Sequence, residues 1–431
     1  MVVSAYSGGI VMRISNLEAK AILLPFKLSF GHALASRNNS VNVVVKATVM
    51  DDNGNLYTGY GESVPRDYVT GETVNGALRA IESEYFPSLE GLEFVAALDA
   101  LKLLRERFSA FGLENNAHGA SWCAVELAII DAVCRASGLS FAALLSIYDV
   151  TRTGNFATPS SAPSPGLSSD IVYGGVIPFG GVAASFVILS YYRYLGLKTV
   201  KMKVGRDWHK DRQVLRLARM IMGQDAILRV DANCAWTVDE TLYFAEKMKE
   251  FRITSIEQPV DPENIAGMQK LTRELNETVV ADESLCTISQ ARNLIENRAC
   301  DAFNIRLSKV GGPLIAMEIA DLARANEVGV MLGAQVGESA ILSAAGRGYA
   351  AVKGPFDNCE GSFNRYLLRQ DLSADDVTLG KGGRAPVFDK PGIGVEIDEW
   401  RVKRFTVASE SELTAGSGSS RKSGELTRSM V

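Results

Sequence analysis

The chain has 431 residues, of which 47% are hydrophobic and 22% charged, and its formal net charge is −5. This length allows two or three domains with an ample core, and the composition is that of a globular protein. The small negative charge gives no reason to expect nucleic acid or an anionic membrane as a partner, and no apolar run is long enough to span a bilayer. Six cysteines without CxxC spacing, and the absence of a secretion signal, predict a reduced cytoplasmic protein.

The N-terminal part of the sequence predicts an antiparallel sheet followed by helices. The stretch VNVVVKATVMDDNGNLYTGYGE has strand patterns on both sides of a turn at residues 52–55. Helical patterns follow at residues 74–86, 96–108 and 120–138, and Gly138 is expected to end the last of them. We assign residues 1–148 to one α+β domain, with residues 1–11 as a candidate extension.

The composition changes after this domain. Residues 149–170 are rich in Ser, Pro and Thr, which predicts a mobile linker or insertion. Eight candidate strands follow, several of them separated by helical patterns: IVYGGVI, TVKMKVG, ILRVDAN, ITSIEQP, TVVADES, AFNIRLS, VGVMLGA and PFDNCEG. Alternating strands and helices predict parallel βαβ units, and eight strands fit a barrel over residues 171–368. An open doubly wound sheet is the alternative, which the lack of GxGxxG after a first strand disfavours.

The C-terminal part is turn-rich over residues 369–407 and ends in a strand pattern, VEIDEWRVKRF. Residues 408–431 are mixtures of Ser, Gly and charged residues, which predict a disordered tail.

Charged residues gather where the barrel strands are expected to end. Lys201 and Lys203 lie two apart on the second strand, so both should face the same side. Asp231, Glu257 and Asp282 follow at the ends of the third, fourth and fifth strands, and barrel active sites lie at these ends. Three converging carboxylates need a cation, and an all-oxygen site suits Mg²⁺. Any one acid alone is more often a solvated residue or a helix cap, but the whole set in register favours a site.

The lysine pair then faces a substrate bound to the metal. Mutual repulsion and partial burial are expected to lower a lysine pKa towards the working pH.

These motifs resemble the enolase superfamily and, within it, the muconate-lactonising subgroup of muconate cycloisomerases and dipeptide epimerases. The matches are Lys201-Met202-Lys203, Asp231 in VDAN, Glu257 in IEQP and Asp282 in ADES. The resemblance implies an α/β fold, a modified TIM barrel (β/α)7β with an N-terminal α+β capping domain to which residues 369–407 return. It also implies Mg²⁺ on the three acids, with Asn233 and Glu283 supporting them.

The resemblance further implies the chemistry. Lys203 would remove the α-proton of a carboxylate substrate to give a metal-stabilised enediolate, while Lys201 lowers the pKa of Lys203 and contacts the carboxylate. The mandelate-racemase branch is excluded, because it needs a histidine at the end of strand seven and VMLGAQVGES has none.

One position departs from the subgroup, which has a second lysine on strand six in an NIK context. Here FNIRLSKVGG places Arg306 there, and Lys309 is expected to point to the other face of the strand. Arginine is a poor base, so Arg306 should stabilise the enediolate or bind a carboxylate. This favours cycloisomerisation or syn elimination. The alternatives are a dipeptide epimerase or amino-acid racemase in which Arg306 replaces the second base, and a non-catalytic metal-binding protein on the same fold.

Substrate contacts are expected from two capping-domain loops and from the ends of strands seven and eight. The candidates are His32, Arg37, Arg66, Tyr68, Thr70, Gln335, Glu338 and Glu360. Arg66 would hold a distal carboxylate and Glu360 a cationic group, although a plain loop role is as good an interpretation for the loop residues. The expected partners are a small-molecule carboxylate and other copies of the chain in a homo-oligomer, with no nucleic acid and no membrane.

Overall fold

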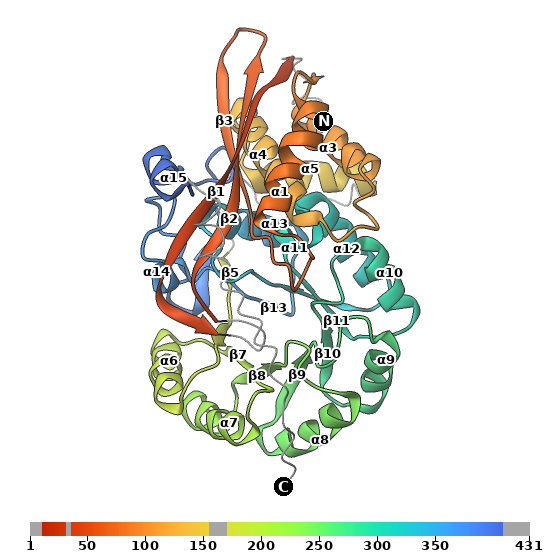
Figure 1. Cartoon of the computed structure of the whole chain (residues 1–431), viewed down its shortest axis with the longest axis vertical. Coiled ribbons are helices and arrows are strands. Elements are labelled where there is room, and N and C mark those ends of the chain that lie inside the picture. The colour runs from red at the N-terminus through yellow and green to blue at the C-terminus, as the bar shows by residue number, and fades with distance from the viewer. Residues whose placement is uncertain (1–10, 32–35, 155–169, 408–431) are drawn as a thin grey trace.

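The computed structural model describes residues 11–31, 36–154 and 170–407. Figure 1 shows an antiparallel sheet with its helices in the upper part of the molecule, above a parallel sheet surrounded by helices. None of the helices in the described residues combines the length and the apolar composition that crossing a membrane requires.

The N-terminal sheet has four antiparallel strands in the order β3-β2-β1-β4. They are β1 (Met12–Gly31), β2 (Ser36–Asp51), β3 (Leu56–Ser63) and β4 (Glu93–Phe94). The predicted turn joins β2 to β3, because the Asp51 carboxylate accepts hydrogen bonds from the main-chain N–H groups of Asn53 and Asn55 at 2.9 and 2.8 Å. The predicted hairpin is therefore confirmed.

Helix α4 (Gly119–Ser137) lies directly on strand β3, because two glycines of the strand leave no side chain between them. A Cβ at Gly59 would lie 2.1 Å from the main-chain nitrogen of Ala132, and one at Gly61 would lie 1.9 Å from the carbonyl oxygen of Ala124. The strand and the helix therefore touch through their backbones.

The other helices of this domain are α1 (Val74–Ala80), η2 (Ile81–Tyr85), α2 (Phe86–Leu89), α3 (Ala97–Ala110) and α5 (Phe141–Thr153). Gly138 ends α4 in the left-handed region, at φ 67°, as predicted. The predicted linker at 149–170 starts too early, because α5 continues to Thr153. Asp149, in its last turns, binds Lys353 of the barrel at 3.0 Å. Residues 155–169 lie outside the described residues.

Eight parallel strands form one sheet in which each strand neighbours the next in sequence. They are β6 (Gly175–Ile177), β7 (Thr199–Lys203), β8 (Ile227–Asp231), β9 (Ile253–Glu257), β10 (Thr278–Ala281), β11 (Ala302–Ile305), β12 (Gly329–Leu332) and β13 (Asn358–Cys359). A parallel bridge between Tyr173 and Cys359 joins the two ends of this sheet. The strand order excludes a doubly wound sheet, in which the order reverses, and confirms the barrel.

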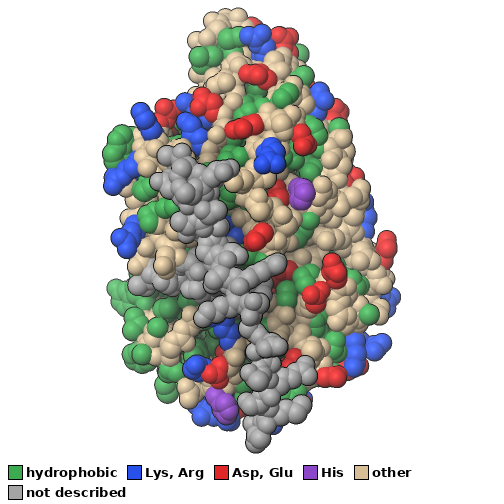
Figure 2. All heavy atoms as spheres, in the orientation of Figure 1, with side chains coloured by type: hydrophobic (Ala, Val, Ile, Leu, Met, Phe, Trp, Pro, Cys, Tyr) green, Lys and Arg blue, Asp and Glu red, His purple; other side chains and the backbone are tan. Residues whose placement is uncertain are grey.

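The helices from residue 182 to residue 383 are α6 (Val182–Leu195), α7 (Trp208–Met222), α8 (Val238–Met248), η3 (Lys249–Phe251), α9 (Ile265–Glu274), α10 (Ile288–Glu296), α11 (Leu307–Val310), α12 (Pro313–Ala325), α13 (Ala340–Lys353), α14 (Asn364–Leu367) and η4 (Lys381–Gly383). Figure 1 shows α6 to α10 along the outside of the strands. Helix α6 also exposes apolar side chains, including Phe186, Val187 and Tyr194. Figure 2 shows hydrophobic side chains gathered at the lower left, where Figure 1 draws α6.

Two predicted strands differ from the structure. In IVYGGVI only Tyr173 and β6 join the barrel, because β5 (Asp170–Val172) pairs antiparallel with β14 (Arg384–Pro386). In VEIDEWRVKRF the ordered element is helix α15 (Glu399–Phe405), not a strand. Asp398 caps this helix by accepting hydrogen bonds from the first main-chain N–H groups, a local signal that the alternating pattern concealed.

Two buried carboxylates of the N-terminal domain hold it against the barrel. Glu62 on β3 accepts hydrogen bonds from the N–H groups of Ser339 and Leu342, at 2.9 and 3.1 Å, where α13 begins. Glu126 on α4 accepts one from the N–H of Leu314 at 3.0 Å, where α12 begins. Helix N-termini favour negative charge, so these contacts fix the domain beside the strands that precede α12 and α13.

Candidate active site

The carboxyl ends of β7, β8 and β9 carry charged side chains at one level. Lys203 is the register partner of Asp231, and Asp231 is the partner of Glu257. Val280 on β10 pairs with Glu257, so Asp282 lies two residues beyond that level. The three acids are 0% exposed, and buried carboxylates need partners.

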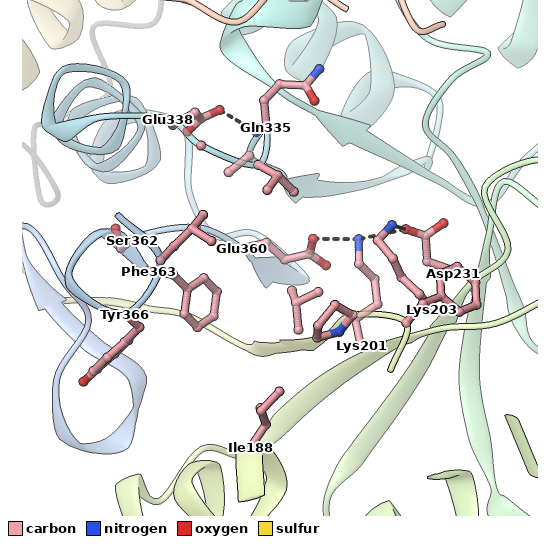
Figure 3. Close-up of a pocket in the computed structure, with 18 of the residues that line it drawn as sticks. Ile188, Lys201, Lys203, Asp231, Gln335, Glu338, Glu360, Ser362, Phe363 and Tyr366 are labelled. Carbon is pink, nitrogen blue, oxygen red and sulfur yellow. Dashed lines mark hydrogen bonds and ion pairs between the residues drawn. The ribbon is translucent and has the colours of Figure 1, made fainter. Parts of the chain in front are cut away.

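The two lysines of β7 face acids of the protein itself. Lys201 Nζ lies 2.9 Å from both carboxylate oxygens of Glu257 and 2.6 Å from Glu360 Oε2. Lys203 Nζ donates to Asp231 Oδ2 at 2.8 Å and to Asn233 Oδ1 at 2.5 Å. Figure 3 shows the lysines side by side, with Lys201 reaching Glu360 and Lys203 reaching Asp231.

The surroundings of Lys201 favour its charged form. Burial alone lowers the pKa of Lys201, but the carboxylates of Glu257, Glu360 and Asp231 outweigh burial and raise it. The prediction that repulsion and burial lower a lysine pKa is therefore wrong for Lys201, because three acids surround it. Lys201 is a fixed cation, and its effect on Lys203 stays a prediction.

Glu257 is surrounded by donors. Besides Lys201, it accepts hydrogen bonds from Arg229 Nη2 at 3.2 Å and Asn304 Nδ2 at 2.8 Å. Burial raises the pKa of Glu257, but the positive charges of Lys201, Arg229 and Arg306 outweigh burial and lower it. Glu257 is therefore an ionised, fully paired carboxylate in the barrel interior.

Arg229 is a site residue that the sequence analysis missed. It is 2% exposed, and its guanidinium also donates to Glu360 Oε1 at 2.7 Å. The signal was present, because Arg229 stands two residues before Asp231 on one strand and therefore faces the same side.

Lys309 contacts Asp282, contrary to the prediction that it points to the other face. Strand β11 ends before Arg306, and Lys309 lies in the short helix α11, from which its side chain reaches Asp282. Its Nζ donates to Asp282 Oδ1 at 2.8 Å and to the main-chain oxygens of Asp282 and Asn304 at 2.6 and 2.9 Å. The alternation rule failed here because the strand had already ended.

Arg306, three residues before Lys309 in the chain, also binds Asp282. Its Nη2 donates to Asp282 Oδ2 and lies 3.6 Å from Glu257 Oε1, while Nη1 donates to Gln335 Oε1 at 3.3 Å. Burial lowers the pKa of Arg306, but Asp282, Glu257 and Glu283 outweigh burial and raise it. The guanidinium therefore stays protonated.

Asn233 and Glu283 lie beside Asp231 on the cavity wall. Asn233 Nδ2 donates to Glu283 Oε1 at 3.0 Å, and the Asn233 N–H donates to Asp231 Oδ1 at 3.0 Å. Among the described residues, the buried Glu283 Oε2 has no hydrogen-bond partner. Burial and the negative charges of Asp282 and Asp231 raise the pKa of Glu283 to about 8.

The expected metal ligands are engaged by protein cations. Within the described ranges, no three acidic, histidine or cysteine side chains are arranged to hold a metal ion. Lysine or arginine groups already bind Asp231, Glu257 and Asp282. The donor type still fits Mg²⁺, and the bare oxygen and raised pKa of Glu283 indicate that the cluster favours further positive charge. The residues therefore fit a divalent cation that takes oxygens from a protein cation.

A cavity of about 590 Å³ opens beside the lysine pair. Lys201, Lys203, Asp231 and Arg306 line one side of it. Apolar side chains line much of the rest, among them Val176, Pro178, Phe179, Val187, Ile188, Tyr191, Phe363, Tyr366 and Leu367. A cavity with charge at one end and an apolar wall suits a small carboxylate that carries an apolar group.

Four of the expected substrate contacts lie on the cavity wall: Tyr68, Gln335, Glu338 and Glu360. Figure 3 shows Glu338 beside Gln335, whose N–H donates to Glu338 Oε1 at 2.6 Å. Glu360 was expected to accept a cationic group of the substrate, but Lys201 and Arg229 already balance its charge.

Arg66 and Thr70 are not among the residues that line the cavity. Arg66 is 4% exposed and donates to the Ser40 hydroxyl at 2.7 Å and the Val336 carbonyl at 3.2 Å. The Thr70 hydroxyl donates to the Arg66 carbonyl at 3.3 Å. Two further candidates cannot be placed in the site, because His32 and the side chain of Arg37 lie outside the described residues.

Known proteins share this sequence pattern and fold. Residues 188–401 match the family described as Enolase C-terminal domain-like. A hydrophobic dipeptide epimerase of Citrifermentans bemidjiense is 30% identical over 399 residues, which cover 90% of this chain and 98% of that protein.

Two solved structures share the fold. A dipeptide epimerase from Enterococcus faecalis, complexed with Mg and L-Leu-L-Tyr, has a TM-score of 0.75 at 23% identity, over 89% of this chain and 99% of that one. A 2-chloromuconate cycloisomerase from Rhodococcus opacus has a TM-score of 0.77 at 22% identity, over 92% of this chain and 100% of that one.

Proposed function

The chain belongs to the enolase superfamily, and we propose that its reaction begins when Lys203 removes the α-proton of a small carboxylate substrate. Membership of this superfamily is what KMK, VDAN, IEQP and ADES indicate. The relative matched at 30% identity is an epimerase, so the chain is an enzyme of this superfamily and not a binding protein that kept only the fold.

The observation that carries the proposal is the position of the lysine pair. Lys201 and Lys203 line the same cavity as Asp231, at the carboxyl ends of the barrel strands. Lys203 is held by Asp231 and Asn233, which orient its nitrogen for proton transfer. As the proton leaves, negative charge moves to the substrate carboxylate oxygens, and the permanently charged Lys201 favours that change.

We further propose that Asp231, Glu257 and Asp282 hold Mg²⁺, with Asn233 and Glu283 behind them. The bound ion would supply Lewis-acid stabilisation of the developing negative charge. Two observations support the ion: the all-carboxylate donor set at adjacent strand ends, and the Mg present in the complex of the Enterococcus faecalis enzyme that shares this fold.

The charge of Arg306 favours proton chemistry on one face of the substrate. Its guanidinium is bonded to Asp282 and its pKa is raised, so it acts as a fixed cation rather than a second base. Cycloisomerisation and syn elimination need only the face served by Lys203. The second candidate is epimerisation, which the named activity of the Citrifermentans bemidjiense relative and the apolar cavity wall favour.

The test is α-hydrogen exchange in deuterated water with Mg²⁺, followed by NMR. The panel contains dipeptides, N-acyl amino acids and acid sugars, with each α-carbon enantiomer supplied separately. We expect exchange with the wild-type enzyme and none with Lys203→Ala, whose circular dichroism spectrum should show that the fold is retained. The absence of exchange with every carboxylate, despite bound Mg²⁺, would contradict the proposal.

The same assay separates the two candidates. If Lys203 acts alone, only one enantiomer of an accepted substrate exchanges. Comparable exchange from both enantiomers, with Arg306→Met abolishing exchange for only one, would identify Arg306 as the second base and favour epimerisation.

A further inference from the structure

Arg306 contacts carboxylate oxygens that the proposed divalent cation would also bind. The guanidinium donates to Asp282 Oδ2 and approaches Glu257 Oε1 to 3.6 Å. Asp282 and Glu257 are two of the three acids proposed to hold Mg²⁺, so the present inference rests on the proposed function. An ion coordinated by both carboxylates would have to share or take the oxygens that Arg306 occupies.

The acids proposed to hold the ion are already bound by protein cations. Among the described residues, five side-chain cations bind four carboxylates: Lys201, Lys203, Arg229, Arg306 and Lys309 against Asp231, Glu257, Asp282 and Glu360. A divalent ion therefore meets acids whose charge is balanced, apart from the bare oxygen of Glu283. Strong coordination requires that a protein cation leaves an oxygen.

Arg306 is the cation best placed to leave. Lys309 is 0% exposed and is also held by two main-chain oxygens, and Lys201 is held by Glu257 and Glu360 together. Arg306 lines the cavity, as Lys201 does, but its Nε is a buried donor without a hydrogen-bond partner among the described residues. Leaving Asp282 would therefore cost Arg306 fewer contacts than leaving their acids would cost Lys309 or Lys201.

A second anchor for the guanidinium already exists on the cavity wall. Arg306 Nη1 donates to Gln335 Oε1, and the Gln335 N–H binds Glu338. Burial raises the pKa of Glu338 to about 8, so a guanidinium placed beside it would favour the carboxylate form. The cavity wall therefore provides two groups that can bind the guanidinium of Arg306: the side-chain amide of Gln335 and the carboxyl group of Glu338.

We propose that Arg306 competes with the divalent cation for Asp282 and Glu257, and that binding of the cation moves the guanidinium towards Gln335 and Glu338. Residue 306 then sets the affinity of the enzyme for its metal. The same movement brings a positive charge to the cavity wall that a substrate contacts.

The test is calorimetric titration of the wild type, Arg306→Met and Arg306→Lys with Mg²⁺ and Mn²⁺ in the absence of substrate. Arg306→Met should bind both ions about 10- to 100-fold more tightly than the wild type. Arg306→Lys keeps the charge but has a single nitrogen and a shorter reach, so its affinity should approach that of Arg306→Met. Arg306→Met that binds no more tightly than the wild type, or Arg306→Lys that binds like the wild type, would overturn competition for the oxygens.

Two further measurements keep this inference separate from the proposed reaction. Adding Asp282→Asn to Arg306→Met should abolish the gain in affinity, and retention of the gain would show that the ion binds elsewhere. A crystal structure with Mn²⁺ should show the guanidinium at Gln335, and an Arg306 that still bonds Asp282 beside the ion would refute the movement. None of these measurements depends on catalytic turnover. Their outcomes therefore test the competition even if no substrate shows α-hydrogen exchange.

Discussion

Replacing Arg229 by methionine should destabilise the protein strongly, because it leaves buried carboxylates without a partner. The guanidinium donates to Glu360 at 2.7 Å, to Glu257 at 3.2 Å and to the Ser255 hydroxyl at 3.2 Å, and Arg229 is 2% exposed. Breaking a buried ion pair by removing one partner costs about 3 to 5 kcal/mol. Since Lys201 still binds both acids, we expect about 3 kcal/mol, the lower end of this range.

The assay is urea unfolding followed by circular dichroism, with Arg212→Met as the matched control. Arg212 binds Glu250 at 2.9 Å, but the two side chains are 48% and 45% exposed. An exposed pair of this kind contributes less than about 1 kcal/mol, so the control should change the unfolding midpoint little. The two variants remove similar ion pairs and differ mainly in burial.

A second variant tests the cause of the loss. Adding Glu360→Gln to Arg229→Met removes the negative charge that the first substitution leaves behind, so part of the stability should return. If Arg229→Met costs no more than Arg212→Met, or if Glu360→Gln makes the double variant still less stable, the buried charge at Glu360 is not what Arg229 compensates.

Three other outcomes follow from the site and its supports. Asp282→Asn should weaken Mg²⁺ binding about 10- to 100-fold in calorimetry, and unchanged binding would remove Asp282 from the ligand set. In the exchange assay Lys203→Ala should be inactive, and if Lys201→Ala alone is inactive their roles are exchanged. Burial raises the pKa of Glu126 from 4.5 to about 7. The protonated side chain therefore stabilises the folded protein fully below pH 4.5, and this stabilisation is lost as the pH rises through about 7. The difference between 7 and 4.5, at about 1.4 kcal/mol for each pH unit, is about 3.5 kcal/mol. Glu126→Gln should therefore lose less stability than the wild type between pH 5 and pH 8, and equal urea midpoint changes would contradict this.

Part of the structure could be predicted from the sequence, because it follows from local backbone geometry. Alternation along a strand puts Lys201 and Lys203 on one face, and the spacing of βα units brings Asp231 level with Glu257, because both follow from repeat lengths within the chain. The same alternation, applied to Arg229, would have found it. The rule failed where the element was misjudged: Lys309 lies in a helical turn after the strand, and VEIDEWRVKRF contains a capped helix.

Only the tertiary structure decided which cation meets which acid. Arg229 and Glu360 are 131 residues apart in the chain, and their contact depends on how the closed barrel brings strands together across its interior. Arg66 lies in a loop that looked suited to substrate, yet packing between the two domains turns it to Ser40 and Val336. Arg306 matches the position of the subgroup's lysine in sequence, but the greater reach of arginine carries its charge to Asp282 and to within 3.6 Å of Glu257. Such pairings depend on side-chain length and strand curvature together, and a linear pattern fixes neither.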